Sequence, residues 1–161
     1  MPNKLQEYPI QLAIKFNKLE VIKSMFKLNK VYIGTLKTGY NPLLDATEKD
    51  LTELALLIID YAGSNIDVLN ACDEEQQWTP LMHAITNNND VVVKKLIDHH
   101  CEINNVDIDG NTPLHLAIIN EHEYLIKVLV KSCPSLTIRN KEGKNAKQLA
   151  KLVDEDLSLL I

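Results

Sequence analysis

A short motif that recurs after 33 residues constrains the fold of this chain more than any other feature. The later copy reads Thr112-Pro113-Leu114-His115-Leu116-Ala117, and the earlier copy reads Thr79-Pro80-Leu81-Met82-His83-Ala84. Threonine is a preferred N-cap, and proline suits the first helical position because the N–H that it lacks would be unsatisfied there. Each copy therefore predicts a turn that leads into a helix.

Weaker copies of the motif extend the same period along the chain. Residues 8–13, 41–46 and 145–150 align with the two strong copies, so five copies are visible. Successive copies are 33 residues apart, except for the second and third copies, which are 38 residues apart. Each copy ends in alanine, a small residue that lets neighbouring helices approach closely. These alanines are Ala13, Ala46, Ala84, Ala117 and Ala150.

A second apolar group follows each of the first four copies at a fixed offset. Its members have the spacing that places them on one face of a helix. The groups are Val21/Ile22/Met25/Phe26, Leu54/Ala55/Ile58/Ile59, Val92/Val93/Leu96/Ile97 and Leu125/Ile126/Leu129/Val130. Each unit is thus predicted to be a pair of short helices. Because such a pair cannot bury its apolar faces alone, the units are expected to stack.

Polar segments with bend residues link the units and are expected to form hairpin-like fingers. They are residues 34–40, 73–78, 107–111 and 139–144. Most of the extra residues of the second unit are assigned to a longer outer loop at residues 63–66. After the fifth motif, residues 154–161 are expected to form a short capping helix.

This pattern resembles the ankyrin repeat family, whose unit is a turn and two helices carrying Thr-Pro-Leu-His-x-Ala. The resemblance implies an all-α ankyrin-repeat solenoid, a single domain of stacked helix-turn-helix units joined by hairpin-like fingers. The expected units of this domain, 1–161, span about residues 5–37, 38–75, 76–108, 109–141 and 142–161, the last being a C-terminal cap.

At several bends this chain lacks the glycine that the family usually has there. The residues found instead are Asn17, Asn29, Asn88, His100 and Cys133. The resemblance implies a left-handed backbone at these positions, which costs on the order of 1 kcal/mol for histidine or cysteine. We therefore expect the array to be less stable than a consensus one.

Composition and charge limit the expected partners and the compartment. The formal net charge is -5 and only one of the 17 basic residues is arginine, so nucleic acid is not expected as a partner. Cys72, Cys101 and Cys133 lack disulfide or metal-ligand spacing, which indicates free thiols in a reducing compartment. No signal peptide or membrane-spanning run is visible. The expectation is a cytoplasmic protein with no membrane partner, in the host cytoplasm or nucleus if the source is a pathogen.

The candidate catalytic and metal-binding groups have structural explanations. In the family that the chain resembles, the histidine at the position of His115 is part of the turn, hydrogen-bonded to threonine and to backbone. The side chains of His99, His100 and Cys101 would point in different directions and could not chelate a metal together. No phosphate-binding loop or hydrolase motif is present. We expect no enzymatic activity, no metal and no cofactor.

The resemblance implies that a partner protein binds the concave side formed by the fingers and the first helices. The residues just before each motif should point there: Glu7, Tyr40, Trp78, Asn111 and Lys144. First-helix positions expected to line the same groove are Asp45, Glu48, His83, Asn87, Leu116 and Asn120. Trp78 beside Tyr40 has the composition of a binding hot spot. The alternative is that both rings merely cover the stems of their fingers.

Two further features have both a structural and a functional explanation. The acidic run Asp73-Glu74-Glu75 is either a solvated loop or an edge that contacts a basic partner. Asn104 follows Glu102-Ile103 and lies eight residues after Leu96, which resembles the preference of the asparaginyl hydroxylase that modifies ankyrin repeats in animal cells. Asn104 is also the asparagine that the turn itself requires.

The function expected from these features is a non-enzymatic protein-protein interaction module, a monomer that acts as an adaptor or inhibitor. Abundant Lys, Asn and Ile with almost no Arg hint at an AT-rich coding genome. A pathogen or viral modulator of host signalling is therefore one hypothesis. The alternative is a substrate-recognition or accessory subunit of an enzyme complex such as a ubiquitin ligase.

Overall fold

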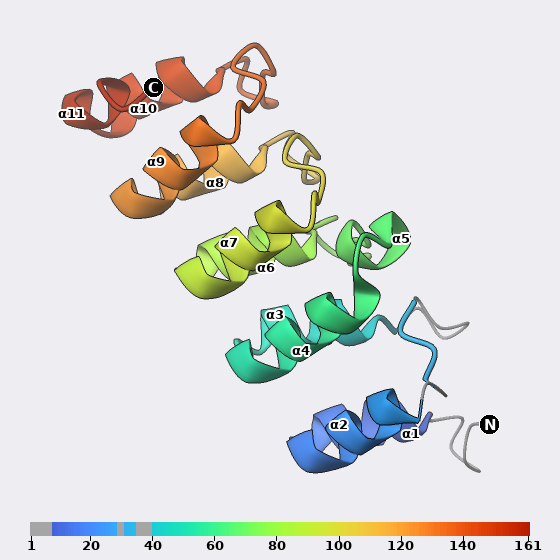
Figure 1. The fold of residues 1–161 in the computed structure, drawn as a ribbon. Helices are drawn as coiled ribbons and strands as arrows, with labels where there is room; N and C mark the ends of the chain where they lie inside the picture. The colour runs from blue at the N-terminus through green and yellow to red at the C-terminus, as the bar shows by residue number, and fades with distance from the viewer. Residues whose placement is uncertain (1–7, 29–30, 35–39) are drawn as a thin grey trace.

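The helices of this protein come in pairs that stack as successive tiers. The computed structural model describes residues 8–28, 31–34 and 40–161, and these form eleven helices and no strand. The tiers follow one another in chain order from one end of the molecule to the other (Figure 1). The predicted all-α repeat solenoid is thereby confirmed. Glu7, Asn29 and residues 35–39, which carried predictions, lie outside the described residues.

The first helix of each tier contributes to one layer. This layer contains α1 (Pro9–Lys15), α3 (Pro42–Glu48), α6 (Pro80–Thr86), α8 (Pro113–Ile119) and α10 (Ala146–Val153). Proline begins four of these helices, where its missing N–H costs nothing. In four helices the residue before the first turn accepts a backbone N–H with its side chain: Asn41, Thr79, Thr112 and Asn145. The motif thus begins the helices by local capping, as predicted.

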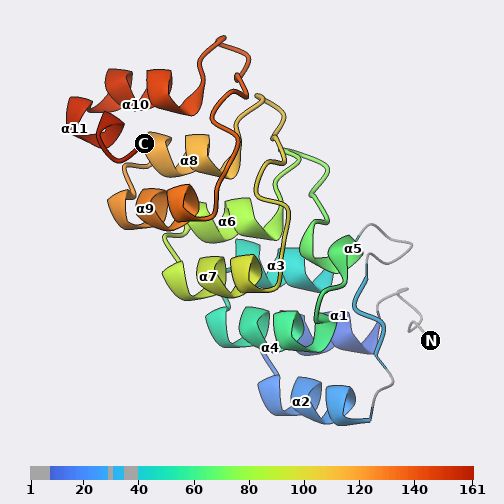
Figure 2. The ribbon, with the colours of Figure 1, turned by 45° about the horizontal axis from the view of Figure 1, so that its top comes forward.

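The second helices form a layer that runs alongside the first (Figure 2). This layer contains α2 (Leu19–Lys27), α4 (Thr52–Ala62), α7 (Asp90–Asp98) and α9 (Glu123–Lys131), and α11 (Glu155–Ser158) follows α10 in the last tier. The core lies between the layers and between the tiers. The five motif alanines are at most 6% exposed, so they sit where adjacent first helices pack most closely.

Most bends within the tiers have a left-handed backbone at a residue other than glycine, and Gly63 after α4 is an exception. Between paired helices this conformation is held by Asn17, Asp50, Asn88 and Glu121. After the second helices, His100 and Cys133 have φ values of 63° and 57°. The left-handed backbone predicted for Asn17, Asn88, His100 and Cys133 is confirmed.

The extra residues of the second tier form the expected turn at residues 63–65, and a short helix that was not predicted follows it. Helix α5 (Ile66–Leu69) begins after Asn65, whose side chain caps its first turn. Val68 and Leu69 of this helix are fully buried. The apolar pair explains the difference, because a solvated loop would leave both side chains in water.

Candidate functional site

The loops that join the second to the fifth tiers are tight turns bonded to one another. The backbone N–H of Asp73 donates to the Trp78 carbonyl at 3.0 Å and closes the first fully described loop. The N–H of Ile108, in the next loop, donates to the Gln76 carbonyl at 2.9 Å. The loops therefore stand side by side as a row next to the first-layer helices. We call the surface formed by this row and the first-layer helices the groove face.

A cavity of about 550 Å³ opens on the groove face between α3, α6 and the loop at residues 73–78. We call it the groove pocket. Its lining residues are Glu48, Asp73, Glu74, Glu75, Gln76, Trp78, His83, Thr86 and Asn87. The structure thus brings four residues that were expected to line the groove, Glu48, Trp78, His83 and Asn87, into one hollow.

Contacts with the next loop and with helix α6 fix the position of Trp78 at this pocket. Its Nε1 donates to the Asp107 carboxylate in the next loop at 3.4 Å. Its ring meets the His83 imidazole edge to face, with 5.3 Å between the ring centroids. His83 is held in turn by the Asp73 carboxylate, 2.9 Å from its Nε2. The half-buried indole is therefore oriented before any partner arrives.

Tyr40 and Asp45 form a separate pair one tier earlier. The Tyr40 hydroxyl donates to the Asp45 carboxylate at 3.0 Å, and Lys49 pairs with the same carboxylate. Burial, together with the nearby Asp45 charge, raises the pKa of Tyr40. Neither Tyr40 nor Asp45 lines the groove pocket.

The side chains of Asn87 and Asn111 are bonded within the stack. Asn87, at the end of α6, donates its amide to the Thr47 carbonyl of the previous tier at 2.9 Å. Asn111 is only 8% exposed, and its amide group bonds to Asp107 and to Asn140 of the next loop. Asn111 therefore presents little surface to a partner. Leu116, which was expected to line the groove, is also buried.

His115 has the structural role that the sequence predicted. It is fully buried, and its Nδ1 lies 2.8 Å from the Thr112 hydroxyl. Its Nε2 lies 3.2 Å from the Lys144 carbonyl of the next loop. Desolvation lowers the pKa of His115, although the bond to the Lys144 carbonyl opposes this effect. The neutral imidazole thus links a helix start to the following tier.

The run from His99 to Cys101 does not converge on one point. The Nδ1 atom of His99 lies 3.0 Å from the Gly63 carbonyl, while Cys101 is buried in the core. Burial raises the pKa of the Cys101 thiol to about 12. Cys101 therefore acts as a small core residue, and Cys72 and Cys133 are exposed free thiols.

Asn104 connects the third tier to the fourth. Its side-chain oxygen accepts the backbone N–H of Ser135 at 2.8 Å, and its own N–H donates to the Glu102 carboxylate. Asn70 makes the corresponding bond one tier earlier, to the N–H of Glu102 at 2.8 Å. This repeated bond supports the structural explanation for Asn104, and its hydroxylation stays a prediction.

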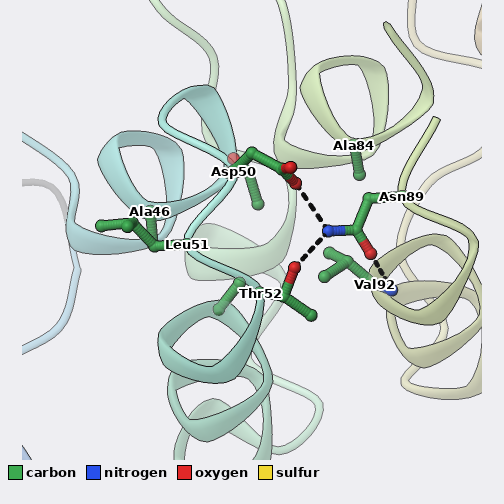
Figure 3. A pocket seen from close by; sticks show the side chains of 9 residues that line it. Ala46, Asp50, Leu51, Thr52, Ala84, Asn89 and Val92 are labelled. Carbon is green, nitrogen blue, oxygen red and sulfur yellow. Dashed lines mark hydrogen bonds between the residues drawn. The ribbon is translucent and has the colours of Figure 1, made fainter. Parts of the chain in front are cut away.

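Tiers are also joined by side chains at the start of the second helices. The Asn89 amide donates to the Asp50 carboxylate at 2.7 Å and to the Thr52 hydroxyl, and its oxygen accepts the N–H of Val92 (Figure 3). Asn89 thereby caps α7 while it holds the previous tier. The small motif alanines Ala46 and Ala84 lie beside this junction.

None of the helices in the described part of the chain is both long enough and apolar enough to cross a membrane.

Comparison with known proteins agrees with the repeat pattern. The family model described as ankyrin repeats (3 copies) matches residues 56–141.

Three of the relatives with similar sequences come from two viruses and a bacterium. A protein of Acanthamoeba polyphaga mimivirus named for its ankyrin repeats is 24% identical over 86% of this chain and 18% of its own length. A Fowlpox virus protein named in the same way is 28% identical over 83% of this chain and 39% of its own length. One from Borreliella burgdorferi is 26% identical over 84% of this chain and 64% of its own length. The chain thus spans less than two thirds of each of these relatives.

Proposed function

The chain belongs to the ankyrin repeat family, and from this premise we propose that it binds another protein through its groove face. Ankyrin repeats are protein-protein interaction modules and are generally non-enzymatic. The bound protein would be held or blocked without chemical change. The chain would thus act as a monomeric adaptor or inhibitor.

The groove pocket is the single observation that supports this surface most strongly. Trp78 is a large aromatic residue, the type most often found to dominate binding energy at interfaces. Its contacts with Asp107 and His83 hold it in place, so little side-chain entropy remains to be lost on binding. Asn111 does not belong to this proposed surface because its side chain is buried.

The relatives support one setting for this function. Two of them come from viruses that infect eukaryotic cells. A role as a viral or pathogen modulator of host signalling is therefore part of the proposal. The free thiols of Cys72, Cys101 and Cys133 support a reducing compartment such as the cytoplasm.

Affinity capture with matched variants tests the proposed surface. The tagged protein is used to capture partners from the cells that express it, beside Trp78→Ala, Thr86→Arg and Val91→Arg variants. Thr86→Arg places a long side chain in the groove pocket without removing Trp78. Val91, half-exposed on α7 in the second layer, supplies the control for an added surface arginine.

We expect one partner to be lost from both groove variants and retained by Val91→Arg. Circular dichroism and urea unfolding establish that each variant is folded before capture. Retention of every partner by a folded Thr86→Arg protein, with loss from Val91→Arg, would place the interface on the second layer instead.

A further inference from the structure

We propose that the groove pocket binds a basic side chain, lysine or arginine, carried by an extended segment of the partner protein. This inference rests on the proposed function and adds the chemistry of the group that is recognised. It follows from the charge, the aromatic wall and the size of the pocket.

Carboxylates dominate the charge of the pocket. Glu48, Asp73, Glu74 and Glu75 line it, and none of the described lining residues is lysine or arginine. Asp73 is already paired with His83 and accepts the backbone N–H of Gln76 at 2.7 Å. In the described part of the chain, Glu74 and Glu75 are exposed and take part in no ion pair. Their charge is thus available to attract a cation from the partner.

The wall formed by Trp78 suits the remainder of such a side chain. Because the indole N–H is directed to Asp107, the part of Trp78 that can meet a ligand is its ring. Lysine and arginine pack their aliphatic stems on apolar surface while the charged head stays with polar groups. A cation near an indole face also gains electrostatic attraction from the ring. The indole therefore suits the aliphatic stem of a basic side chain, and the neighbouring carboxylates suit its charged head.

The size of the pocket favours a side chain on a peptide over a bare ion. Its volume of about 550 Å³ falls within the range of pockets that enclose organic ligands. A divalent ion would need several ligands at one point, and no three His, Cys, Asp or Glu residues among those described are placed to hold a metal. The carboxylates instead spread along the 73–78 loop and the end of α3, as an extended basic segment would require.

Fluorescence of the single tryptophan reports on this pocket directly. The probe is a synthetic Gly/Ser peptide with two arginines, titrated into the full chain while Trp78 emission is recorded. A second peptide carries glutamate in place of both arginines, and spermidine serves as a flexible polycation. We expect a saturable change with the arginine peptide that weakens at high salt, and none with the glutamate peptide.

Two charge variants of equal net charge provide the matched comparison. Glu74→Gln/Glu75→Gln removes two carboxylates from the pocket and should weaken binding of the arginine peptide about tenfold. Glu20→Gln/Glu53→Gln removes two exposed carboxylates from α2 and α4, and should leave affinity within about twofold of the parent because these charges lie outside the pocket. Equal affinity of the parent and the pocket variant overturns the inference. An equal loss in both variants, or an equal response to spermidine, overturns it as well.

Capture of the cellular partner separates this inference from the proposed function. If Thr86→Arg loses the partner while Glu74→Gln/Glu75→Gln retains it fully, the groove binds a protein but not through a basic side chain. If both variants retain it, binding through the groove face itself is wrong. Loss from both, with retention by Glu20→Gln/Glu53→Gln, agrees with the inference.

Discussion

The indole of Trp78 meets the imidazole of His83 edge to face, with ring centroids 5.3 Å apart and an angle of 72° between the planes. Trp78 belongs to a loop and His83 to α6 in the same tier. Since His83 is also paired with Asp73 of that loop, this histidine braces the loop against the helix. The geometry of the groove pocket therefore depends on a residue that also lines it.

Replacing His83 should loosen this loop. His83→Ala removes the ring contact with Trp78 and the bond to Asp73, so we expect a loss of about 1–2 kcal/mol in the free energy of unfolding. Trp78 emission should shift to longer wavelength as its ring becomes more solvated. Urea unfolding and the emission spectrum of the folded protein measure the two effects. An unchanged spectrum would show that His83 does not hold the indole.

Asn89 should contribute to stability both by capping and by joining two tiers. Asn89→Ala loses the cap on Val92 and the bonds to Asp50 and Thr52, which should cost about 2 kcal/mol. Asn89→Ser can keep the cap but not both inter-tier bonds, so it should cost less. Urea unfolding of both variants separates the contributions. Equal losses would mean that the inter-tier bonds carry all of the effect.

Glycine should stabilise the protein at two strained bends. His100 and Cys133 have left-handed backbone, where glycine avoids a steric cost on the order of 1 kcal/mol. We expect His100→Gly and Cys133→Gly each to raise the midpoint of urea unfolding. Lys94→Gly, within helix α7, is the control and should lower it, because helix interiors disfavour glycine. If both glycine variants had a lower midpoint than the parent, the backbone at His100 and Cys133 would not be strained.

Acidification should destabilise the fold through two histidines. Desolvation lowers the pKa values of His115 and His122 from about 6.5, so the unfolded chain binds more protons than the folded one as the pH falls. Protonation of His115 would also place a second ring N–H against the N–H of Thr112. Stability is thus fully present above about pH 6.5 and is lost as the pH falls through the folded pKa values.

Unfolding free energies measured between pH 7 and pH 5 test the histidine contribution. The loss on acidification should be smaller in His115→Gln than in the parent, although His115→Gln is less stable at pH 7. Asn120→Gln alters an exposed polar side chain without changing any titratable group, so this control should keep the parental pH dependence. If the slopes of parent and His115→Gln coincide, His115 does not contribute to the acid sensitivity.

Two measurements on Asn104 test its bond to Ser135 and its hydroxylation. Asn104→Ala leaves the Ser135 N–H without its acceptor and should cost about 1–2 kcal/mol of stability. The alternative explanation, hydroxylation in animal cells, would add the mass of one oxygen to the Asn104 peptide. Mass spectrometry of that peptide tests for the hydroxylation, and finding only unmodified peptide would contradict it.

The helix starts could be predicted because the interactions that create them are local. Thr112 caps α8 through a residue three positions later, and Pro113 begins the helix with a suitable φ. The repeated motif sets the spacing of the tiers in the same way. The alanine in each copy then indicates where neighbouring tiers come close.

Contacts across tiers could not be predicted in the same way. The role of Asn111 depends on Asn140, 29 residues away in sequence, and that bond turns an expected binding residue into a buried one. Helix α5 likewise forms because Val68 and Leu69 find a core to enter. The 33-residue period of the repeats predicts neither the bond between Asn111 and Asn140 nor helix α5.

The order of the paired helices and the spacing of the tiers were thus predictable from the repeats, because caps, proline and apolar spacing act within a few residues. Which side chains are free to bind a partner depended instead on how the tiers pack. Trp78 is oriented by Asp107 of the following loop, and Glu74 and Glu75 surround it with charge only because their loop folds back toward α6. A side chain's availability is set by neighbours that only the stacked array brings into contact.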